Sequence, residues 1–469
     1  MLVLMNRWPR GRRRAWGALL ACAALGCSGE ARNRPDVLII TLDTTRQDHL
    51  GTYGYARDTS PAIDRFGEDS VVYDRAWASG AWTLPTHASI VTGKHVSSHG
   101  AHFDIGAADA SLGEVLEGEF FERHKARRLS EDEVTLAELL SARGYATAAF
   151  AAGPWLAPPF GLLQGYQVRD AEVKGVSGRR AEEITNRFIE WLIGLPDEVP
   201  LHALVNYFDP HSPYEPPEGF DDLPHARDPL DPGQNELFVN GGTVLKQAQR
   251  SALVDRYDGE IRYMDHHLGR LLAALRRVDR YRDALIVVVG DHGEILGEHG
   301  VLGHGRWLYE GVLRIPLLVH FPGGVGAGQR VNDLISQVDL LPLIAAELGL
   351  ELPPGVEGVG PGKRKTVLAQ AFRDPFSLSS YGERYDRDLT AVVRWPWKLI
   401  VSNRGSMEIY QLADDPSEAR PVAERATAVR LAKALSETLD ALGPERTAPL
   451  ATGVDAELEE SLRALGYVE

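Results

Sequence analysis

Short apolar runs rich in β-branched residues are the feature that most limits how this chain can fold. Val37–Leu42 and Leu285–Val289 are almost entirely apolar, and Leu201–Phe208 is a third run of this kind. Such runs are typical of strands that are buried on both faces, as in parallel sheets covered by helices. Thr135–Phe150 shows the pattern of a helix followed by a strand. We therefore predict an α/β fold with a large, mostly parallel central sheet flanked by helices.

Ionisable side chains follow each of these three runs. Asp43 follows Val37–Leu42, Asp209 and His211 follow Leu201–Phe208, and Asp291 and His292 follow Leu285–Val289. The carboxyl ends of parallel strands meet at one edge of a sheet, where open α/β proteins place their functional sites. An aspartate beside a histidine is suited to Mn²⁺, Zn²⁺ or another divalent ion. Taken alone, Asp43 is equally suited to capping a helix, and Asp209 to forming a loop turn.

A further stretch, Ala81–Gly93, combines a hydroxyl group, a proline and a histidine. Thr83 provides a hydroxyl that can act as a nucleophile. The residue before a proline avoids the helical conformation, and a threonine caps a helix well. Pro85 therefore predicts an extended turn and then a helix that begins near Thr86 or His87. A helix start carries free N–H groups and positive potential, which suit an anionic ester.

Together these stretches resemble the motifs of the sulfatase family, a branch of the alkaline phosphatase superfamily. Thr83–Gly93 resembles the nucleophile motif of that family. Asp43–Gly51 and Asp291–Gly300 resemble its two metal-ligand segments. The resemblance extends over nearly all of the chain that follows the first 33 residues.

The C-terminal part of the chain has a pattern of its own. Val392–Val401 and Glu408–Leu412 read as antiparallel strands, and Ala426–Leu442 reads as an amphipathic helix. In the sulfatase family such a segment forms a small second unit. The resemblance therefore implies a catalytic domain over residues 35–375 and a C-terminal α+β subdomain over residues 376–469.

Three positions depart from the family pattern. Thr83 stands where sulfatases carry the Cys or Ser that is oxidised to formylglycine. His87 replaces an Arg, and Thr44 replaces the second Asp of the usual pair. We expect no formylglycine, because threonine cannot be converted to it. A threonine nucleophile resembles that of phosphodiesterases and of phosphoethanolamine or phosphoglycerol transferases in the same superfamily.

The resemblance implies a site that holds a divalent metal ion, Ca²⁺, Mn²⁺, Zn²⁺ or Mg²⁺, and no organic cofactor. The implied metal ligands come from two strand ends and the nucleophile: Asp43, Asp291, His292 and Thr83. The residues assigned to catalysis carry a hydroxyl or an imidazole: Thr83, His87, His211 and His304. A second metal position would use one carboxylate and two imidazoles: Asp209, His211 and His304.

These features predict a metal-dependent hydrolase of sulfate, phosphate or phosphonate esters that forms a covalent intermediate on Thr83. The substrate would be the anionic ester of a small molecule, a glycan or a lipid. Two alternatives remain open: a phospho-group transferase acting on an envelope glycan or lipid, and a catalytically inactive, sulfatase-like binding lipoprotein. The altered positions favour the inactive alternative, whereas the retained Asp43, Asp291 and His292 oppose it.

The first residues of the chain predict export. Arg residues between positions 7 and 14 precede an apolar run, Ala15–Leu25, which is too short to span a bilayer and ends just before Cys27. We predict a signal peptide of lipoprotein type over residues 1–27 and a linker over residues 28–34. The protein would then lie in the periplasm or at the outer or cell membrane, with a lipid anchor as its membrane contact.

Charge and cysteine content exclude some classes of protein. The 469-residue chain carries a formal net charge of −16, which argues against nucleic acid as a partner. Both cysteines, Cys22 and Cys27, lie in the predicted signal. The mature chain would therefore contain no disulfide and no thiolate metal ligand.

Overall fold

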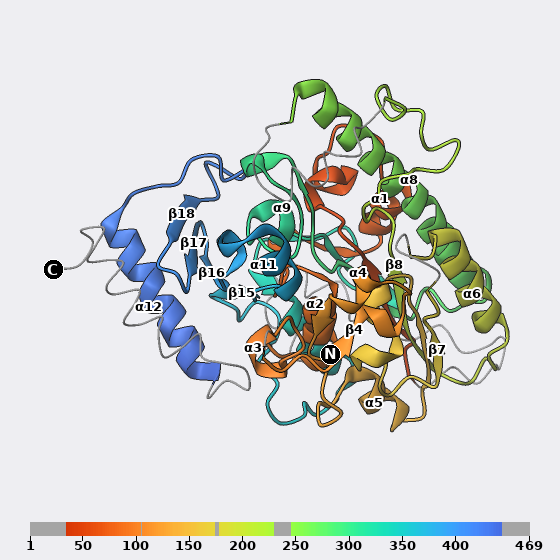
Figure 1. Ribbon diagram of the computed structural model, residues 1–469. Helices are drawn as coiled ribbons and strands as arrows, with labels where there is room; N and C mark the ends of the chain where they lie inside the picture. Colours follow the sequence, from red (N-terminus) through yellow and green to blue (C-terminus); the bar gives the residue numbers. More distant parts are fainter. Residues whose placement is uncertain (1–33, 105, 174–177, 229–244, 443–469) are drawn as a thin grey trace, which may run out of the picture.

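The computed structural model describes residues 34–104, 106–173, 178–228 and 245–442. The predicted signal peptide, with Cys27, lies outside these residues. Within them the chain forms one large sheet and one small sheet, each packed against helices (Figure 1). Figure 1 shows the small sheet and helix α12 (Arg425–Leu442) on one side of the molecule, and α6 (Ala181–Ile193) and α8 (Gln247–Arg277) side by side on the other.

The large sheet has eight strands in the order β13-β2-β12-β9-β1-β8-β6-β7. Their bounds are β1 (Val37–Leu42), β2 (Val71–Tyr73), β6 (Ala146–Phe150), β7 (Val168–Asp170), β8 (Leu201–Tyr207), β9 (Leu285–Gly290), β12 (Leu317–His320) and β13 (Arg330–Val331). Only β12 runs antiparallel to its neighbours β2 and β9. Every residue of β1, β8 and β9 is buried, as expected for strands covered on both faces. The predicted, mostly parallel central sheet is confirmed.

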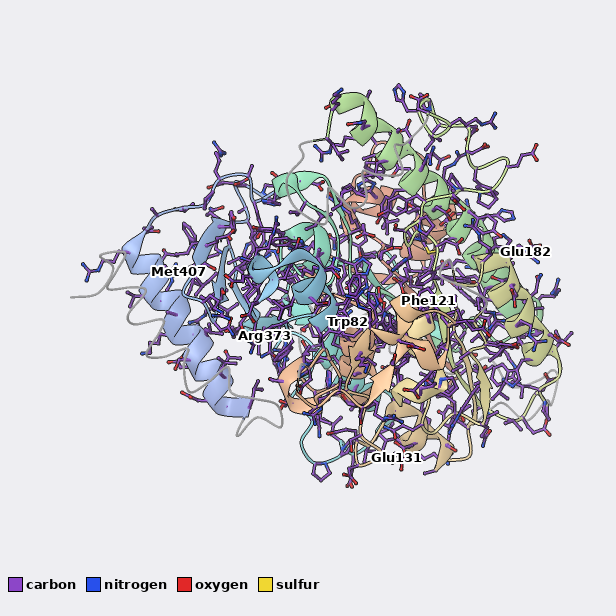
Figure 2. The ribbon with its side chains drawn as sticks, viewed as in Figure 1. Trp82, Phe121, Glu131, Glu182, Arg373 and Met407 are labelled. Carbon is purple, nitrogen blue, oxygen red and sulfur yellow. The ribbon has the colours of Figure 1, made fainter. Side chains whose placement is uncertain are left out.

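Alternate residues of β1 pack against different helices. Leu38 and Ile40 lie in a core with α1 (Pro61–Glu68), α6 and α8, whereas Ile39 lies in a core with α2 (Thr83–Thr92), α5 (Leu136–Ser141) and α10 (Leu340–Leu348). The other helices are α3 (Val96–His99), α4 (Glu119–Glu122), α9 (Glu310–Leu313) and α11 (Pro375–Tyr381). Side chains fill the space between these layers (Figure 2). Among the described helices, none is both long and apolar enough to cross a membrane.

The small sheet is antiparallel throughout and has the order β15-β16-β17-β18. Its strands are β15 (Val367–Ala371), β16 (Leu389–Arg394), β17 (Trp397–Ser402) and β18 (Met407–Gln411). Helix α12 packs against this sheet through a separate apolar core. The predicted C-terminal α+β unit is thus present, and its sheet includes β15, which precedes the domain boundary that we placed at residue 376. Three short strand pairs complete the structure: β3 (Ala76–Trp77) with β14 (Ile335–Ser336), β4 (Ala110–Ser111) with β5 (Lys125–Ala126), and β10 (Ile295–Leu296) with β11 (Leu302–Gly303).

A buried lysine joins the small sheet to the rest of the molecule. Lys398 on β17 is fully buried, and its Nζ lies 2.9 Å from Glu310 Oε1 on α9 and 2.8 Å from Glu418 Oε1. The indole N–H of Trp77 also donates to Glu310. Charges this deep are tolerated only when they are paired, so this cluster fixes how the two parts of the chain pack.

Candidate active site

The register of the large sheet brings three strand ends to one place. Leu42, the last residue of β1, pairs with Tyr207 of β8 on one side and with Gly290 of β9 on the other. Asp43 and Asp291 therefore leave adjacent strands at the same level. The sequence prediction that these two acids meet at the carboxyl edge of the sheet agrees with this geometry.

Asp43, Asp291 and His292 form a cluster whose ligand atoms lie within 4.8 Å of one another. All three side chains are fully buried. Asp43 Oδ1 and Asp291 Oδ2 accept no hydrogen bond from any described residue. Burial raises the pKa of both carboxyl groups well above the usual range, and the nearby Asp291 and Glu294 raise the pKa of Asp43 further. Two buried carboxylates with orphaned oxygens are costly unless a cation lies between them, so the donor set fits a divalent ion.

The hydrogen bonds of His292 define which ring nitrogen faces this cluster. Nδ1 lies 2.9 Å from the carbonyl oxygen of Gly293, to which it must donate. Nε2 then carries the lone pair, and it lies 3.4 Å from Asp291 Oδ2 and 3.4 Å from Thr83 Oγ1. Burial lowers the pKa of His292 well below its usual value, which keeps the ring neutral. A neutral imidazole with its free nitrogen beside two carboxylates is a suitable metal ligand.

Thr83 is the first residue of α2, and its hydroxyl lies 3.5 Å from Asp43 Oδ2. The prediction that this helix begins near Thr86 or His87 was wrong, because Trp82 is the extended residue and the helix starts directly after it. Pro85 is accommodated because N–H groups in the first turn of a helix have no partner within that helix. Trp82 stacks on Phe103 with ring centroids 3.9 Å apart, which fixes the entry to the helix.

His87 is fully buried and does not face the cluster with a free nitrogen. Nδ1 lies 2.9 Å from the carbonyl oxygen of Thr83, and Nε2 lies 3.0 Å from Thr41 Oγ1. Burial lowers the pKa of His87 to about 4, so the ring is neutral near pH 7. Nδ1 also lies 3.6 Å from Asp291 Oδ2, so His87 borders the cluster although both of its nitrogens are hydrogen-bonded elsewhere. The catalytic role that we predicted for His87 stays a prediction. The ring holds the backbone of Thr83 against β1.

Thr44 contributes its backbone to the cluster. Its N–H donates to Asp291 Oδ1 at 3.2 Å, and its carbonyl oxygen accepts a 2.7 Å hydrogen bond from the Tyr257 hydroxyl. Its φ of 50° lies in the left-handed region, which is unusual for a β-branched residue and is characteristic of functional sites. The Thr44 hydroxyl has no hydrogen-bond partner among the described residues.

His211 and His304 lie next to the cluster. The His304 ring centroid is 4.4 Å from that of His292 and 5.0 Å from that of His211. His211 stacks on Phe208, and its Nδ1 lies 2.7 Å from the carbonyl oxygen of Ser212. Burial and the neighbouring His304 lower the pKa of His211 to about 4. The structure thus brings both predicted histidines to the site.

Asp209 does not join these two histidines. Arg180 Nη1 donates to its Oδ1 at 3.0 Å, and the N–H of Ala181, the first residue of α6, donates to its Oδ2 at 2.9 Å. Glu260 accepts from the same Arg180 atom. Within the described residues, Asp43, Asp291 and His292 form the only group of three or more His, Cys, Asp or Glu close enough to share an ion. The second metal position that we predicted with Asp209 is therefore not assembled.

Glu294 is completely buried beside the site, although no sequence pattern singled it out as a site residue. Its Oε1 lies 3.0 Å from His304 Nδ1, and its Oε2 accepts a 2.9 Å hydrogen bond from the Tyr214 hydroxyl. The only sequence signal for it is its place immediately after Asp291-His292-Gly293. Gly293 itself is required there, because a Cβ would lie 2.1 Å from the carbonyl oxygen of Gly311.

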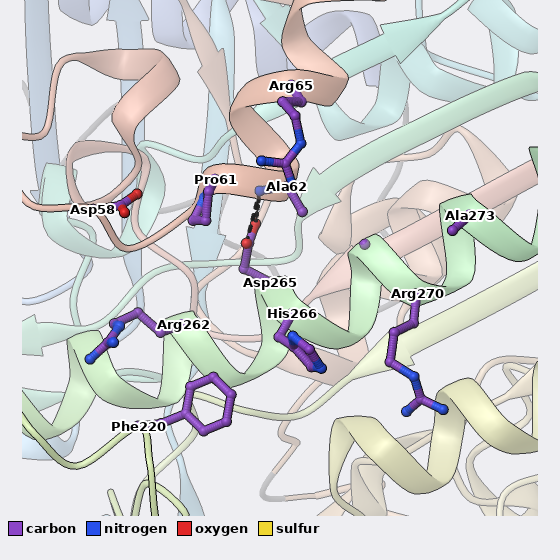
Figure 3. Close-up of a pocket in the computed structure, with 11 residues that line it drawn as sticks. Asp58, Pro61, Ala62, Arg65, Phe220, Arg262, Asp265, His266, Arg270 and Ala273 are labelled. Atoms are coloured by element: carbon purple, nitrogen blue, oxygen red, sulfur yellow. Dashed lines mark hydrogen bonds between the residues drawn. The ribbon is translucent and has the colours of Figure 1, made fainter.

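A separate pocket of about 450 Å³ lies between α1 and α8 (Figure 3). Arg65, Arg262 and His266 line it, and no residue of the cluster described above does. At its base, Asp265 accepts a hydrogen bond from the N–H of Ala62 (Figure 3). It also accepts one from the N–H of Ile63. Asp265 therefore caps the start of α1, and the pocket is distinct from the candidate active site.

Comparison with known proteins agrees with this fold and site. The sulfatase family model matches residues 35–350, and the model for the C-terminal part of N-sulphoglucosamine sulphohydrolase matches residues 297–445. An arylsulfatase of Clostridium perfringens is 22% identical over 82% of this chain and 89% of its own length. Human iduronate 2-sulfatase is 24% identical over 74% of this chain and 76% of its own length.

Solved structures share the same fold. The phosphonate monoester hydrolase of Agrobacterium radiobacter has a TM-score of 0.64 at 22% identity, covering 87% of this chain and 95% of its own. A protein solved with its substrate D-glucosamine-2-N,6-O-disulfate has a TM-score of 0.68 at 18% identity, covering 87% of this chain and 98% of its own.

These matches, with the sheet and the cluster at its edge, define a sulfuric or phosphoric ester hydrolase of the alkaline phosphatase superfamily. Within that superfamily, the chain belongs to the sulfatase family.

Proposed function

We propose that this protein hydrolyses sulfate, phosphate or phosphonate esters with Thr83 as the direct nucleophile and a divalent metal ion as cofactor. The observation that supports this most directly is the position of the Thr83 hydroxyl, 3.5 Å from Asp43 Oδ2 and 3.4 Å from His292 Nε2. A hydroxyl next to buried carboxylates and an unprotonated imidazole can be activated for attack.

The ion would be held by Asp43, Asp291 and His292, with the Thr83 hydroxyl beside it. Their two orphaned carboxylate oxygens and free imidazole nitrogen supply the donors. An imidazole in the set favours Mn²⁺ or Zn²⁺ over Ca²⁺ and Mg²⁺, which prefer oxygen ligands. When bound, such an ion lowers the pKa of a nearby hydroxyl and offsets negative charge on the ester.

The residues of the chain account for the remaining chemistry. Thr83 Oγ1 forms a bond to phosphorus or sulfur, and its proton passes to Asp43 Oδ2. The ester bond breaks, and the protonated imidazole of His211 or His304 gives the leaving oxygen a proton. Water then attacks the Thr83 ester and gives one proton to the same imidazole. The proton on Asp43 returns to Thr83 Oγ1, which restores the hydroxyl as the inorganic anion or the phosphonate is released.

The absence of formylglycine favours phosphorus esters. In sulfatases the hydrated aldehyde has two hydroxyls, and the second can expel sulfate without attack at sulfur. Thr83 has a single hydroxyl, so water must attack the central atom of the intermediate. Phosphorus accepts such attack in the superfamily's threonine-dependent enzymes, and the fold is shared with phosphonate monoester hydrolases.

Two changes at the site compensate each other in charge, which opposes a purely binding role. Thr44 stands in place of an acid, and the neutral His87 stands in place of a cation, so the family's local charge balance is kept. Random loss of function would not be expected to pair these changes while it preserves Asp43, Asp291 and His292.

We also propose that the protein is exported and lipid-anchored at Cys27, on the basis of the first residues alone.

The test is hydrolysis by the mature chain, with Mn²⁺ or Zn²⁺ added, of nitrophenyl sulfate, phosphate and phosphate diester and of a phenylphosphonate ester. We expect metal-dependent turnover of at least one phosphorus ester and loss of this turnover in Thr83→Ala. Thr44→Val, which keeps the backbone contacts of position 44, serves as the matched control. Turnover that survives in Thr83→Ala would overturn the proposal, and release of product only when an alcohol acceptor is added would identify a transferase.

A further inference from the structure

The short hairpin that follows the metal cluster places two ionisable residues opposite each other. Ile295 on β10 pairs with Gly303 on β11. The residues that flank this pair, Glu294 and His304, therefore meet at the open end of the hairpin, and Glu294 Oε1 lies 3.0 Å from His304 Nδ1. This arrangement turns the strand that leaves the metal cluster back towards the site.

Glu294 is held from its other side as well. Its Oε2 accepts a 2.9 Å hydrogen bond from the hydroxyl of Tyr214, which is itself buried. Both oxygens of a fully buried carboxylate thus have a defined partner. A carboxylate only accepts hydrogen bonds, so His304 Nδ1 must carry a proton and donate it to Glu294.

This contact determines the tautomer and orientation of His304. With Nδ1 occupied, Nε2 is the nitrogen left for other contacts, and it makes no hydrogen bond with any described residue. His211 has no comparable carboxylate partner, since its Nδ1 lies 2.7 Å from the carbonyl oxygen of the adjacent Ser212. Of the two histidines beside the cluster, His304 is therefore the one hydrogen-bonded to a carboxylate side chain within the described residues.

We propose that Glu294 is a positioning residue that presents His304 Nε2 to the leaving oxygen of the ester; this rests on the proposed function. In the imidazolium form of His304 both ring nitrogens carry a proton. When the bond between the leaving oxygen and the central atom breaks, the Nε2 proton passes to that oxygen, and the ring becomes neutral while Nδ1 still donates to Glu294. When water attacks the Thr83 ester, one of its protons passes to the same nitrogen. The imidazole thus returns to its starting state once per turnover, and Glu294 keeps it in place throughout.

Substrates should differ in how strongly their turnover depends on Glu294. A leaving group such as nitrophenolate departs without help, whereas an unsubstituted phenolate or an alkoxide needs a proton from the enzyme. Loss of the positioned imidazole should therefore affect poor leaving groups far more than good ones. A residue that merely supports the fold would affect both alike.

The experiment compares Glu294→Gln with the wild type on nitrophenyl, phenyl and alkyl esters of the class that is turned over, with the metal-loaded protein. We expect kcat/KM for phenyl and alkyl esters to fall at least about 10-fold more than for nitrophenyl esters. His304→Gln should show the same dependence on leaving group, and the double variant should be no worse than His304→Gln alone. Glu351→Gln, which makes the same change at an exposed residue outside the site, is the matched control and should keep the wild-type dependence.

Two results would overturn the inference. A uniform loss across all leaving groups in Glu294→Gln would show a structural role, and a weaker affinity for Mn²⁺ or Zn²⁺, measured by titration, would show that Glu294 acts on the metal instead. Both are distinguishable from failure of the proposed function, which is judged by Thr83→Ala on nitrophenyl esters alone.

Discussion

His292 Nε2 lies 3.4 Å from Thr83 Oγ1, although the two residues are 209 positions apart in the chain. The contact exists because β9 delivers His292 to the carboxyl edge of the sheet, where α2 begins with Thr83. The hydrogen bond from His292 Nδ1 to Gly293 leaves Nε2 free to face the hydroxyl. The proposed nucleophile and the candidate metal cluster are thus one unit, and changes to either should affect both metal binding and turnover.

Without a bound metal ion, repulsion between the carboxylates of Asp43 and Asp291 should lower the free energy of unfolding. We expect added Mn²⁺ or Zn²⁺ to raise the free energy of unfolding by about 2.7 kcal/mol at a hundredfold excess over Kd. Asp43→Asn should lose most of this gain. In chelator, the same variant should be at least as stable as the wild type, because it removes one of two buried carboxylates that lack a partner.

Thermal and urea unfolding with and without metal measure these effects. Asp132→Asn is the control, since Asp132 is exposed and lies outside the cluster. An equal metal-dependent gain in wild type and Asp43→Asn would contradict the assignment of Asp43 as a ligand.

The buried charge cluster at Lys398 should contribute strongly to stability. Lys398→Met leaves the carboxylates of Glu310 and Glu418 buried without their cation, so we expect a loss of about 3–5 kcal/mol in the free energy of unfolding. Lys433→Met removes an exposed lysine that lies 3.7 Å from Glu437, and it should change stability by less than about 0.5 kcal/mol. Similar values for the two variants, measured by urea unfolding, would refute the structural role of Lys398.

A buried histidine in the large sheet should make the fold sensitive to acid. His202 on β8 is fully buried, with Nε2 3.1 Å from the Tyr166 hydroxyl and Nδ1 3.2 Å from the Val37 carbonyl oxygen. Burial lowers its pKa to about 4, whereas in the unfolded chain the pKa is about 6.5. Between these values the unfolded state binds the extra proton, so stability is fully present above pH 6.5 and falls as the pH decreases towards 4.

At pH 4, protonation of His202 in the unfolded state should lower the free energy of unfolding by about 3 kcal/mol relative to neutral pH. His202→Asn keeps a donor near the Val37 carbonyl and removes the titrating ring. Its free energy of unfolding should therefore fall less steeply than that of the wild type over this pH range. Parallel curves for the two proteins would show that His202 does not contribute.

The sequence predicts the central sheet well because strands that are buried on both faces consist of continuous apolar residues, a pattern that is visible in the sequence. The apolar runs of β1, β8 and β9 and the acids that follow them are visible without any knowledge of the fold. Once these strands are placed side by side, the meeting of Asp43 with Asp291 and His292 follows from the rule for parallel sheets. The positions of Asp43, Asp291 and His292 depend only on where strands end, and the sequence pattern defines those ends.

The remaining site residues depend on contacts that no pattern records. His87 was assigned to catalysis because it stands at the Arg position of the nucleophile motif, but the hydroxyl of Thr41 and the carbonyl of Thr83 occupy both of its nitrogens. Asp209 appeared to be a ligand, but it is held by Arg180 from the start of α6. Glu294 was missed because its partner is brought back only by the β10–β11 hairpin.

The measurement that tests direct attack by Thr83 most sharply is the mass of the peptide that carries residue 83, after the metal-loaded protein is mixed with substrate and quenched in acid. Direct attack predicts unmodified threonine before mixing and, during turnover, a mass increase equal to the transferred sulfuryl, phosphoryl or phosphonyl group. Thr83→Ser should form the same adduct, and Thr83→Ala should form none and lose at least about 10³-fold in kcat. Turnover with no adduct on this peptide, together with an active Thr83→Ala variant, would contradict it.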